Sequence, residues 1–130
     1  MVIINSTILS GAGAIPSLTS LLPGIRKLLL VTDSNIAQLN GVQQIRALLE
    51  KHCPQVSVID NVPAEPTHHD VRQQMATLGN ASFDVVVGVG GGSVLDVAKL
   101  LSVLCHPDSP GLDALLAGEK PTQRVQSWLI

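Results

Sequence analysis

The residues best suited to chemistry in this sequence are three glycines followed by a hydroxyl, Gly90-Gly91-Gly92-Ser93, with the carboxylate of Asp96 close behind. An apolar segment at residues 85–89 precedes the glycines and an apolar helical period follows them, which predicts a strand, a tight turn and a helix. Glycines let a ligand approach the backbone, and the start of a helix presents unpaired N–H groups and a positive dipole end. The turn is therefore a candidate phosphate site, with glycines that serve packing alone as the alternative.

Two standard phosphate-binding fingerprints do not fit this turn. The dinucleotide fingerprint reads Gly-x-Gly-x-x-Gly, but the string that begins at Gly88 has Ser93 at its last position. The Walker motif needs a lysine directly before Ser or Thr, and the first lysine after the glycines is Lys99. The prediction of anion binding therefore depends on the glycines themselves and on the hydroxyl at the start of the helix.

A second candidate group is Asp33, which follows the apolar segment at residues 28–31. It lies 20 residues beyond Gly13, an offset at which an acidic side chain can accept a hydrogen bond from a ribose 2′-hydroxyl. Such a carboxylate would repel a 2′-phosphate. The alternative is that Asp33 caps the turn at Ser34 and Asn35.

Apolar strand-like segments alternate with helical patterns along the chain, and these are the elements that must position the candidate residues. The predicted strands cover residues 2–9, 28–31, 56–59 and 85–89, and a further strand-like run begins at 126. The predicted helices begin near Pro16, at residue 41, after a capping box of Thr67 and Asp70, and after the glycines, with a short turn at 113–117. This alternation predicts an α/β fold, a Rossmann-like, doubly wound and mostly parallel sheet that binds ligands at the carboxyl ends of its strands.

Composition narrows the function classes. The chain has 130 residues and is 45% hydrophobic, which suits a single domain with its own core. Its formal net charge of −2 predicts no basic surface that would bind a polyanion. One Phe, one Trp and no Tyr leave no platforms for stacking bases, so no nucleic-acid partner is expected. The N-terminal segment has no basic region or long apolar run, so we expect no signal peptide, no membrane partner and a cytoplasmic location. Cys53 and Cys105 lack metal-site spacing and are predicted to be buried thiols.

The string from Gly90 to Lys99 resembles the GGGSxxDxAK signature of the iron-containing (group III) alcohol dehydrogenases. Residues 11–22 are similar to the first βα turn of that family, residues 29–33 to its second strand and residues 63–67 to its proline loop. The resemblance covers essentially the whole chain in order. It implies that residues 1–130 are the amino-terminal dinucleotide-binding domain of a dehydroquinate-synthase-like fold.

The resemblance also implies roles for the candidate residues. The turn Gly90-Gly91-Gly92-Ser93 would hold the pyrophosphate of NAD, and Asp33 would face the adenosine ribose and favour NAD over NADP. Asp96 matches a motif carboxylate close to the cofactor; alternatively it is a helix-dipole partner in the first turn, paired with Lys99. At position 65 this sequence differs from the family pattern, because it has Glu65 where the family often has Asn before the Pro-Thr pair.

Members of the family also bind a divalent metal, usually iron, through an aspartate and three histidines of a following helical domain. We expect that domain to be absent from this chain, because the chain's four histidines, His52, His68, His69 and His106, do not reproduce such a metal set. His68 and His69 are neighbours on a helix, so they point about 100° apart and cannot both face one ion. The apolar run at residues 126–130 also leads us to expect the amino-terminal half of a longer enzyme.

The implied function is that of an NAD(P)-dependent alcohol dehydrogenase or aldehyde reductase acting on a small alcohol or aldehyde as a homo-oligomer, a dimer. This chain alone is predicted to be inactive. A free-standing nucleotide- or phosphate-binding module without catalysis stays open as an alternative, as does a related enzyme such as a glycerol dehydrogenase or a dehydroquinate-synthase-like protein. Ser93 and Asp33 favour the alcohol dehydrogenases.

Overall fold

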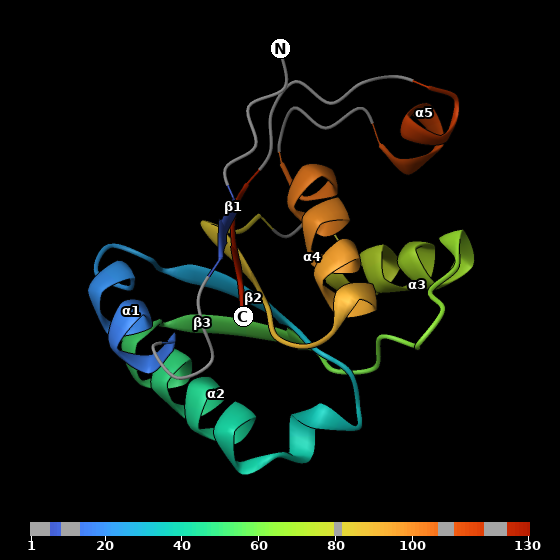
Figure 1. Cartoon of the computed structure of the whole chain (residues 1–130). Helices are drawn as coiled ribbons and strands as arrows, with labels where there is room; N and C mark the ends of the chain where they lie inside the picture. Colours follow the sequence, from blue (N-terminus) through green and yellow to red (C-terminus); the bar gives the residue numbers. More distant parts are fainter. Residues whose placement is uncertain (1–5, 9–13, 80–81, 107–110, 119–124) are drawn as a thin grey trace.

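A computed structural model describes residues 6–8, 14–79, 82–106, 111–118 and 125–130 of the protein. Strands and helices alternate along the chain, as Figure 1 shows. The strands are β1 (Ser6–Ile8), β2 (Lys27–Val31), β3 (Gln55–Ile59), β4 (Val85–Gly88) and β5 (Gln126–Leu129). The helices are α1 (Ala14–Leu21), the short 3-10 helix η1 (Ile36–Gln38), α2 (Asn40–His52), α3 (His68–Leu78), α4 (Gly92–Leu104) and α5 (Leu112–Leu116).

The five strands of the described residues form one sheet in the order β1-β5-β4-β2-β3, and each neighbouring pair is parallel. Parallel neighbours need long crossover connections, which the helices supply. Helices α1 and α2 cover one face of the sheet, and α3 and α4 cover the other (Figure 1). The doubly wound α/β fold predicted from the sequence is therefore confirmed.

Strand β2 shows why the strands of this sheet are uniformly apolar. Leu29 and Val31 belong to the core beneath α3 and α4, whereas Leu28 and Leu30 belong to the core beneath α1 and α2. All four side chains are buried. Side chains alternate between the faces of a strand, so a strand covered by helices on both sides needs apolar residues at every position.

Helix α3 begins and ends where the sequence predicts. The N–H of Asp70 donates to Thr67 Oγ1 at 3.2 Å, and the N–H of Thr67 donates to Asp70 Oδ2 at 2.8 Å, so the capping box is complete. The carboxylate of Asp70 accepts hydrogen bonds from the Thr67 backbone N–H and from the Thr67 hydroxyl, and these two bonds, the backbone one first, lower the pKa of Asp70. Gly79 ends the helix with a φ of 63°, a conformation that favours glycine.

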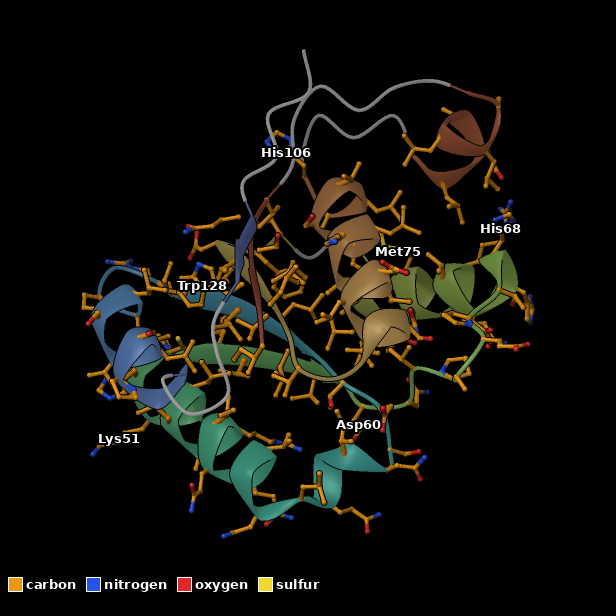
Figure 2. The ribbon with its side chains drawn as sticks, viewed as in Figure 1. Lys51, Asp60, His68, Met75, His106 and Trp128 are labelled. Carbon is orange, nitrogen blue, oxygen red and sulfur yellow. The ribbon has the colours of Figure 1, made fainter. Side chains whose placement is uncertain are left out.

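The predicted element bounds differ in detail from the structure. Strand β4 ends at Gly88 instead of Val89, and α5 begins one residue earlier than the predicted turn at 113–117. Only residues 6–8 of the predicted strand 2–9 lie within the described residues, where they form β1. Helix η1 was not predicted. The strand-like run near the end of the chain is β5, which lies between β1 and β4 and places Trp128 in the interior (Figure 2).

Both cysteines are buried free thiols, as the sequence predicts. Burial raises the pKa of Cys105 to about 11, and burial followed by the nearby charge of Asp84 raises the pKa of Cys53. Within the described residues, no helix combines the length and apolar character that crossing a membrane requires.

Candidate functional site

The loops that leave the carboxyl ends of β2, β3 and β4 enclose a cleft of about 330 Å³, lined by residues 33–35, 62–64 and 91–94. The chain leaves β2 toward β3 through α2 on one face, and it leaves β4 toward β5 through α4 on the other face. Strands β2 and β4 are neighbours, so their loops diverge at a topological switch point, where open α/β sheets bind ligands. The structure thus brings Asp33 together with Gly91, Gly92 and Ser93.

The N-terminus of α4 points its unpaired N–H groups toward this cleft. The first hydrogen bond of the helix runs from the N–H of Leu95 to the carbonyl of Gly91, at 3.0 Å. The preceding N–H groups, those of Gly92, Ser93 and Val94, therefore have no carbonyl partner within the helix. The N-cap residue is Gly91, which has no side chain with which to accept a hydrogen bond from these N–H groups. An anion in the cleft would find three donors and the positive end of the helix dipole.

The glycines of the turn serve two different purposes. Gly90 has a φ of +150°, and a Cβ there would lie 2.7 Å from Ile36 Cδ1, so the fold itself requires glycine at this position. Nothing lies within 4 Å of a Cβ built on Gly91 or Gly92. The fold therefore leaves open space beside these two glycines, which line the cleft. Packing therefore does not require glycine at 91 and 92, and because both residues line the cleft, a ligand there could approach their backbone closely.

Ser93 lies in the cleft as predicted, but its hydroxyl already has an acceptor. Ser93 Oγ donates to the carbonyl oxygen of Ala64 at 2.5 Å, which joins α4 to the loop between β3 and α3. The backbone N–H of Ser93 remains one of the three unpaired donors. The group that Ser93 offers to an anion in this arrangement is thus its N–H.

Asp33 caps the turn that follows β2, which was the alternative interpretation of this residue. Its Oδ1 accepts hydrogen bonds from the N–H groups of Asn35 and Ile36, each at 2.8 Å. Both bonds end on Oδ1, so the capping role and a contact of Oδ2 with a ligand are compatible. Asp33 also lines the cleft. Gly13, from which its offset was counted, lies outside the described residues.

Asp96 lies apart from the cleft that holds Asp33. It is exposed and lines a neighbouring groove of about 240 Å³ between α4 and the start of α3, together with His68 and with Ser93, which lines both cavities. Because α4 begins at Gly92, Asp96 falls in its second turn, so the interpretation as a first-turn dipole partner is wrong. The part of the chain that the structure describes contains no ion pair between Asp96 and Lys99.

Thr32 organises the strand ends around the cleft, and sequence reasoning missed it. Its N–H donates to the carbonyl of Ile59 at 2.8 Å, its Oγ1 donates to the carbonyl of Val89 at 2.8 Å, and its own carbonyl accepts from the N–H of Val62 at 3.3 Å. The side chain is buried. A polar residue directly after an apolar run, which the sequence shows, was the available signal. Through these hydrogen bonds, Thr32 links the three loops that line the cleft.

A larger cavity of about 480 Å³ lies between β3 and α3, and no residue of α4 lines it. Its polar lining includes Asp60, Asp70 and Gln74, and the buried Oε1 of Gln74 makes no hydrogen bond among the described residues. The carboxylates of Asp60 and Asp70 make this cavity unfavourable for an anion. In the described residues, no group of three or more His, Cys, Asp or Glu side chains could hold a metal ion. The smaller cleft is therefore the candidate site.

Residues 5–130 match the family model of iron-containing alcohol dehydrogenases. The chain is 33% identical over 102 residues to long-chain-alcohol dehydrogenase 1 of Geobacillus thermodenitrificans, covering 78% of this chain and 26% of that protein. It is 43% identical over 81 residues to 4-hydroxybutyrate dehydrogenase of Cupriavidus necator, covering 62% of this chain and 21% of that protein.

A solved structure, NADH-dependent butanol dehydrogenase A from Thermotoga maritima, superposes with a TM-score of 0.76 at 25% identity over 99% of this chain and 33% of that one. The chain thus spans about a third or less of the relatives it matches. With the family model matched over residues 5–130, the chain belongs to the iron-containing alcohol dehydrogenase family.

Proposed function

We propose that the cleft binds NAD and that this chain is the dinucleotide-binding part of an alcohol dehydrogenase or aldehyde reductase. The observation that carries the proposal is the open space above Gly91 and Gly92, next to the unpaired N–H groups that begin α4. A pyrophosphate is a double anion that can approach a backbone without side chains and accept hydrogen bonds from these donors. The family supports an oxidoreductase that acts on an alcohol.

In this proposal the described residues bind and orient the dinucleotide. The N–H groups of Gly92, Ser93 and Val94 hold the pyrophosphate, and Asp33 Oδ2 accepts from a hydroxyl of the adenosine ribose. The carboxylate of Asp33 would repel a 2′-phosphate, which favours NAD over NADP. A solved relative is described as NADH-dependent, which supports this preference.

We assign Asp96 to the part of the cofactor beyond the pyrophosphate. Asp96 and Ser93 line the same groove, and Ser93 also lines the cleft, so the two cavities adjoin at the start of α4. When bound, the nicotinamide would supply the hydride acceptor for oxidation of a CH–OH group. Fixing the pyrophosphate and the ribose fixes the direction in which the nicotinamide extends.

The proposal assigns no metal ligand to the described residues. The family name implies iron, but the described residues present no donor set for it, so we derive no step through a metal in this chain. We propose a small alcohol or aldehyde as the substrate, in line with the butanol named for one solved relative. Another relative is named for long-chain alcohols. The cytoplasmic location and the dimer stay predictions.

Titration of the purified chain with NADH and NADPH, followed by the fluorescence of the reduced nicotinamide, tests the proposal. We expect saturable binding of NADH and a dissociation constant for NADPH at least about tenfold higher, about 1.4 kcal/mol, because of the charge on Asp33. Inorganic pyrophosphate should compete with NADH. The absence of saturable NADH binding would contradict the proposal, and equal affinity for both dinucleotides would contradict the role of Asp33.

A further inference from the structure

One wall of the cleft belongs to the loop between β3 and α3. Figure 2 marks the two ends of this loop with Asp60, just after β3, and His68, at the start of α3. Residues 62–64 of the loop line the cleft opposite the start of α4. The hydrogen bond from Ser93 Oγ to the Ala64 carbonyl joins this wall to α4 across 29 residues of sequence.

The number of protons on the Ser93 hydroxyl limits what the side chain can do. A serine hydroxyl has one proton to donate, and phosphate oxygens accept hydrogen bonds. While that proton is donated to Ala64, the side chain gives no hydrogen bond to a phosphate. We infer that Ser93 is a positioning residue whose hydroxyl holds the loop wall against α4, while backbone N–H groups hold the phosphates. This inference deepens the proposed function and depends on it only for the identity of the ligand.

The rest of the loop explains why one hydrogen bond matters. At its start, the buried Val62 donates its N–H to Thr32, and at its end the N–H of Thr67 donates to Asp70. Between these points lie residues 63–66, of which the two prolines have no N–H to donate. The Ala64 carbonyl thus ties the middle of the loop to α4. Loss of the Ser93 hydroxyl should free the wall without unfolding the domain.

Hydrogen exchange of the ligand-free chain tests the hydroxyl without any cofactor. We expect Ser93→Ala to raise the exchange rate of the Val62 amide about tenfold, the factor that corresponds to one net hydrogen bond of about 1.4 kcal/mol. Ser93→Thr, which keeps a hydroxyl, should restore protection. Ser20→Ala is the matched control, because Ser20 Oγ also donates to a backbone carbonyl, that of Pro16 in α1, away from the cleft. An unchanged Val62 amide in Ser93→Ala would overturn the inference.

Binding of two ligands separates a positioning hydroxyl from a direct phosphate ligand. Inorganic pyrophosphate needs only the N–H groups of α4, which Ser93→Ala retains, so its affinity should stay within about twofold. NADH is large enough to contact the loop wall and should bind about fivefold or more weakly to Ser93→Ala, with recovery in Ser93→Thr. An equal loss for pyrophosphate and NADH would show a direct contact and overturn the inference.

The exchange and binding measurements can contradict the positioning role of Ser93 and the proposed function independently of each other. If the unaltered chain binds no NADH while Ser93→Ala still accelerates exchange at Val62, the proposed function is wrong and the positioning role of Ser93 stands. If the chain binds NADH and the exchange rate is the same with and without the hydroxyl, the proposed function stands and the positioning role is wrong.

Discussion

Gly91 and Gly92 are the residues at which a single added side chain should separate ligand binding from folding. A Cβ at either position meets no protein atom within 4 Å, so Gly91→Val or Gly92→Val should fold, while the valine side chain occupies the space next to the α4 N–H groups. We expect NADH affinity to fall by more than about tenfold, about 1.4 kcal/mol. The measurement is NADH titration of variants whose unfolding transitions match the parent chain.

Gly41→Val provides the control for this pair. Gly41 lies in the first turn of α2, and a Cβ there also meets nothing within 4 Å, so the substitution is chemically the same but at a residue that does not line the cleft. It should leave NADH affinity unchanged. If Gly91→Val and Gly92→Val bind NADH as well as Gly41→Val does, the open space above the turn does not hold a phosphate.

Asp33 combines a capping role with the proposed contact to ribose, and two substitutions separate them. Asp33→Asn keeps an oxygen that can accept from the N–H groups of Asn35 and Ile36 but removes the charge, whereas Asp33→Gly removes both. If repulsion of the 2′-phosphate sets cofactor choice, both variants should bind NADPH better relative to NADH. The ratio of the two dissociation constants is the quantity to measure. A ratio that moves in neither variant would leave Asp33 as a turn cap alone.

At the scale of elements, the ends of β2 and β4 opposite the cleft depend on one carboxylate. Asp84 Oδ2 accepts hydrogen bonds from the N–H groups of Arg26 and Lys27, each at 3.0 Å. The bond from Lys27 and then the bond from Arg26 lower the pKa of Asp84 below that of an unfolded aspartate, about 3.9. A carboxyl group whose pKa is depressed in the folded state stabilises the fold above the unfolded value, and the contribution is lost as pH falls through the folded pKa.

Asp84→Asn should therefore lower the free energy of unfolding near neutral pH and make little difference in acid. We expect the gap between the parent chain and Asp84→Asn to be constant from about pH 5 to pH 8 and to shrink below about pH 4. Urea unfolding of both proteins across this range measures it. A gap that persists at the acid end would mean that the ionised carboxylate is not the source of the stabilisation.

How far the elements could be predicted from sequence depended on how local their causes are. The strand β2, the capping box at Thr67 and the stop at Gly79 follow from residues close to one another in the chain, and all three are confirmed. The position of β5 between β1 and β4 depends on pairings between distant segments, which no local pattern contains. The same holds within the cleft: the glycines were found from the sequence, but the bond from Ser93 to Ala64 and the links made by Thr32 join segments far apart.

At the scale of the molecule, the two faces of the sheet have separate cores that meet only at the strands. One core lies beneath α1 and α2 and the other beneath α3 and α4, and α5 packs against the second core through Leu112 and Leu115. At the surface, an ion pair between Arg72 and Asp113 joins α3 to α5. The cleft lies at the carboxyl ends of β2, β3 and β4, and β2 and β4 contribute side chains to both cores. The positions of its three loops therefore depend on the packing of the sheet against the helices of both faces.

The last prediction concerns the 130 residues purified by themselves. The chain spans 26% of one curated dehydrogenase and 21% of another, and its described residues contain no set of three or more metal-donor side chains. We expect it to retain neither iron nor zinc stoichiometrically and to reduce no NAD with short alcohols, because hydride transfer needs the substrate carbon held against the nicotinamide as well as a bound dinucleotide. NADH binding should persist, since the α4 N-terminus and Asp33 are both present. Elemental analysis, NAD reduction assays and NADH titration of one preparation measure all three properties, and turnover or a tightly held metal would show that these residues hold catalytic groups that we have not assigned.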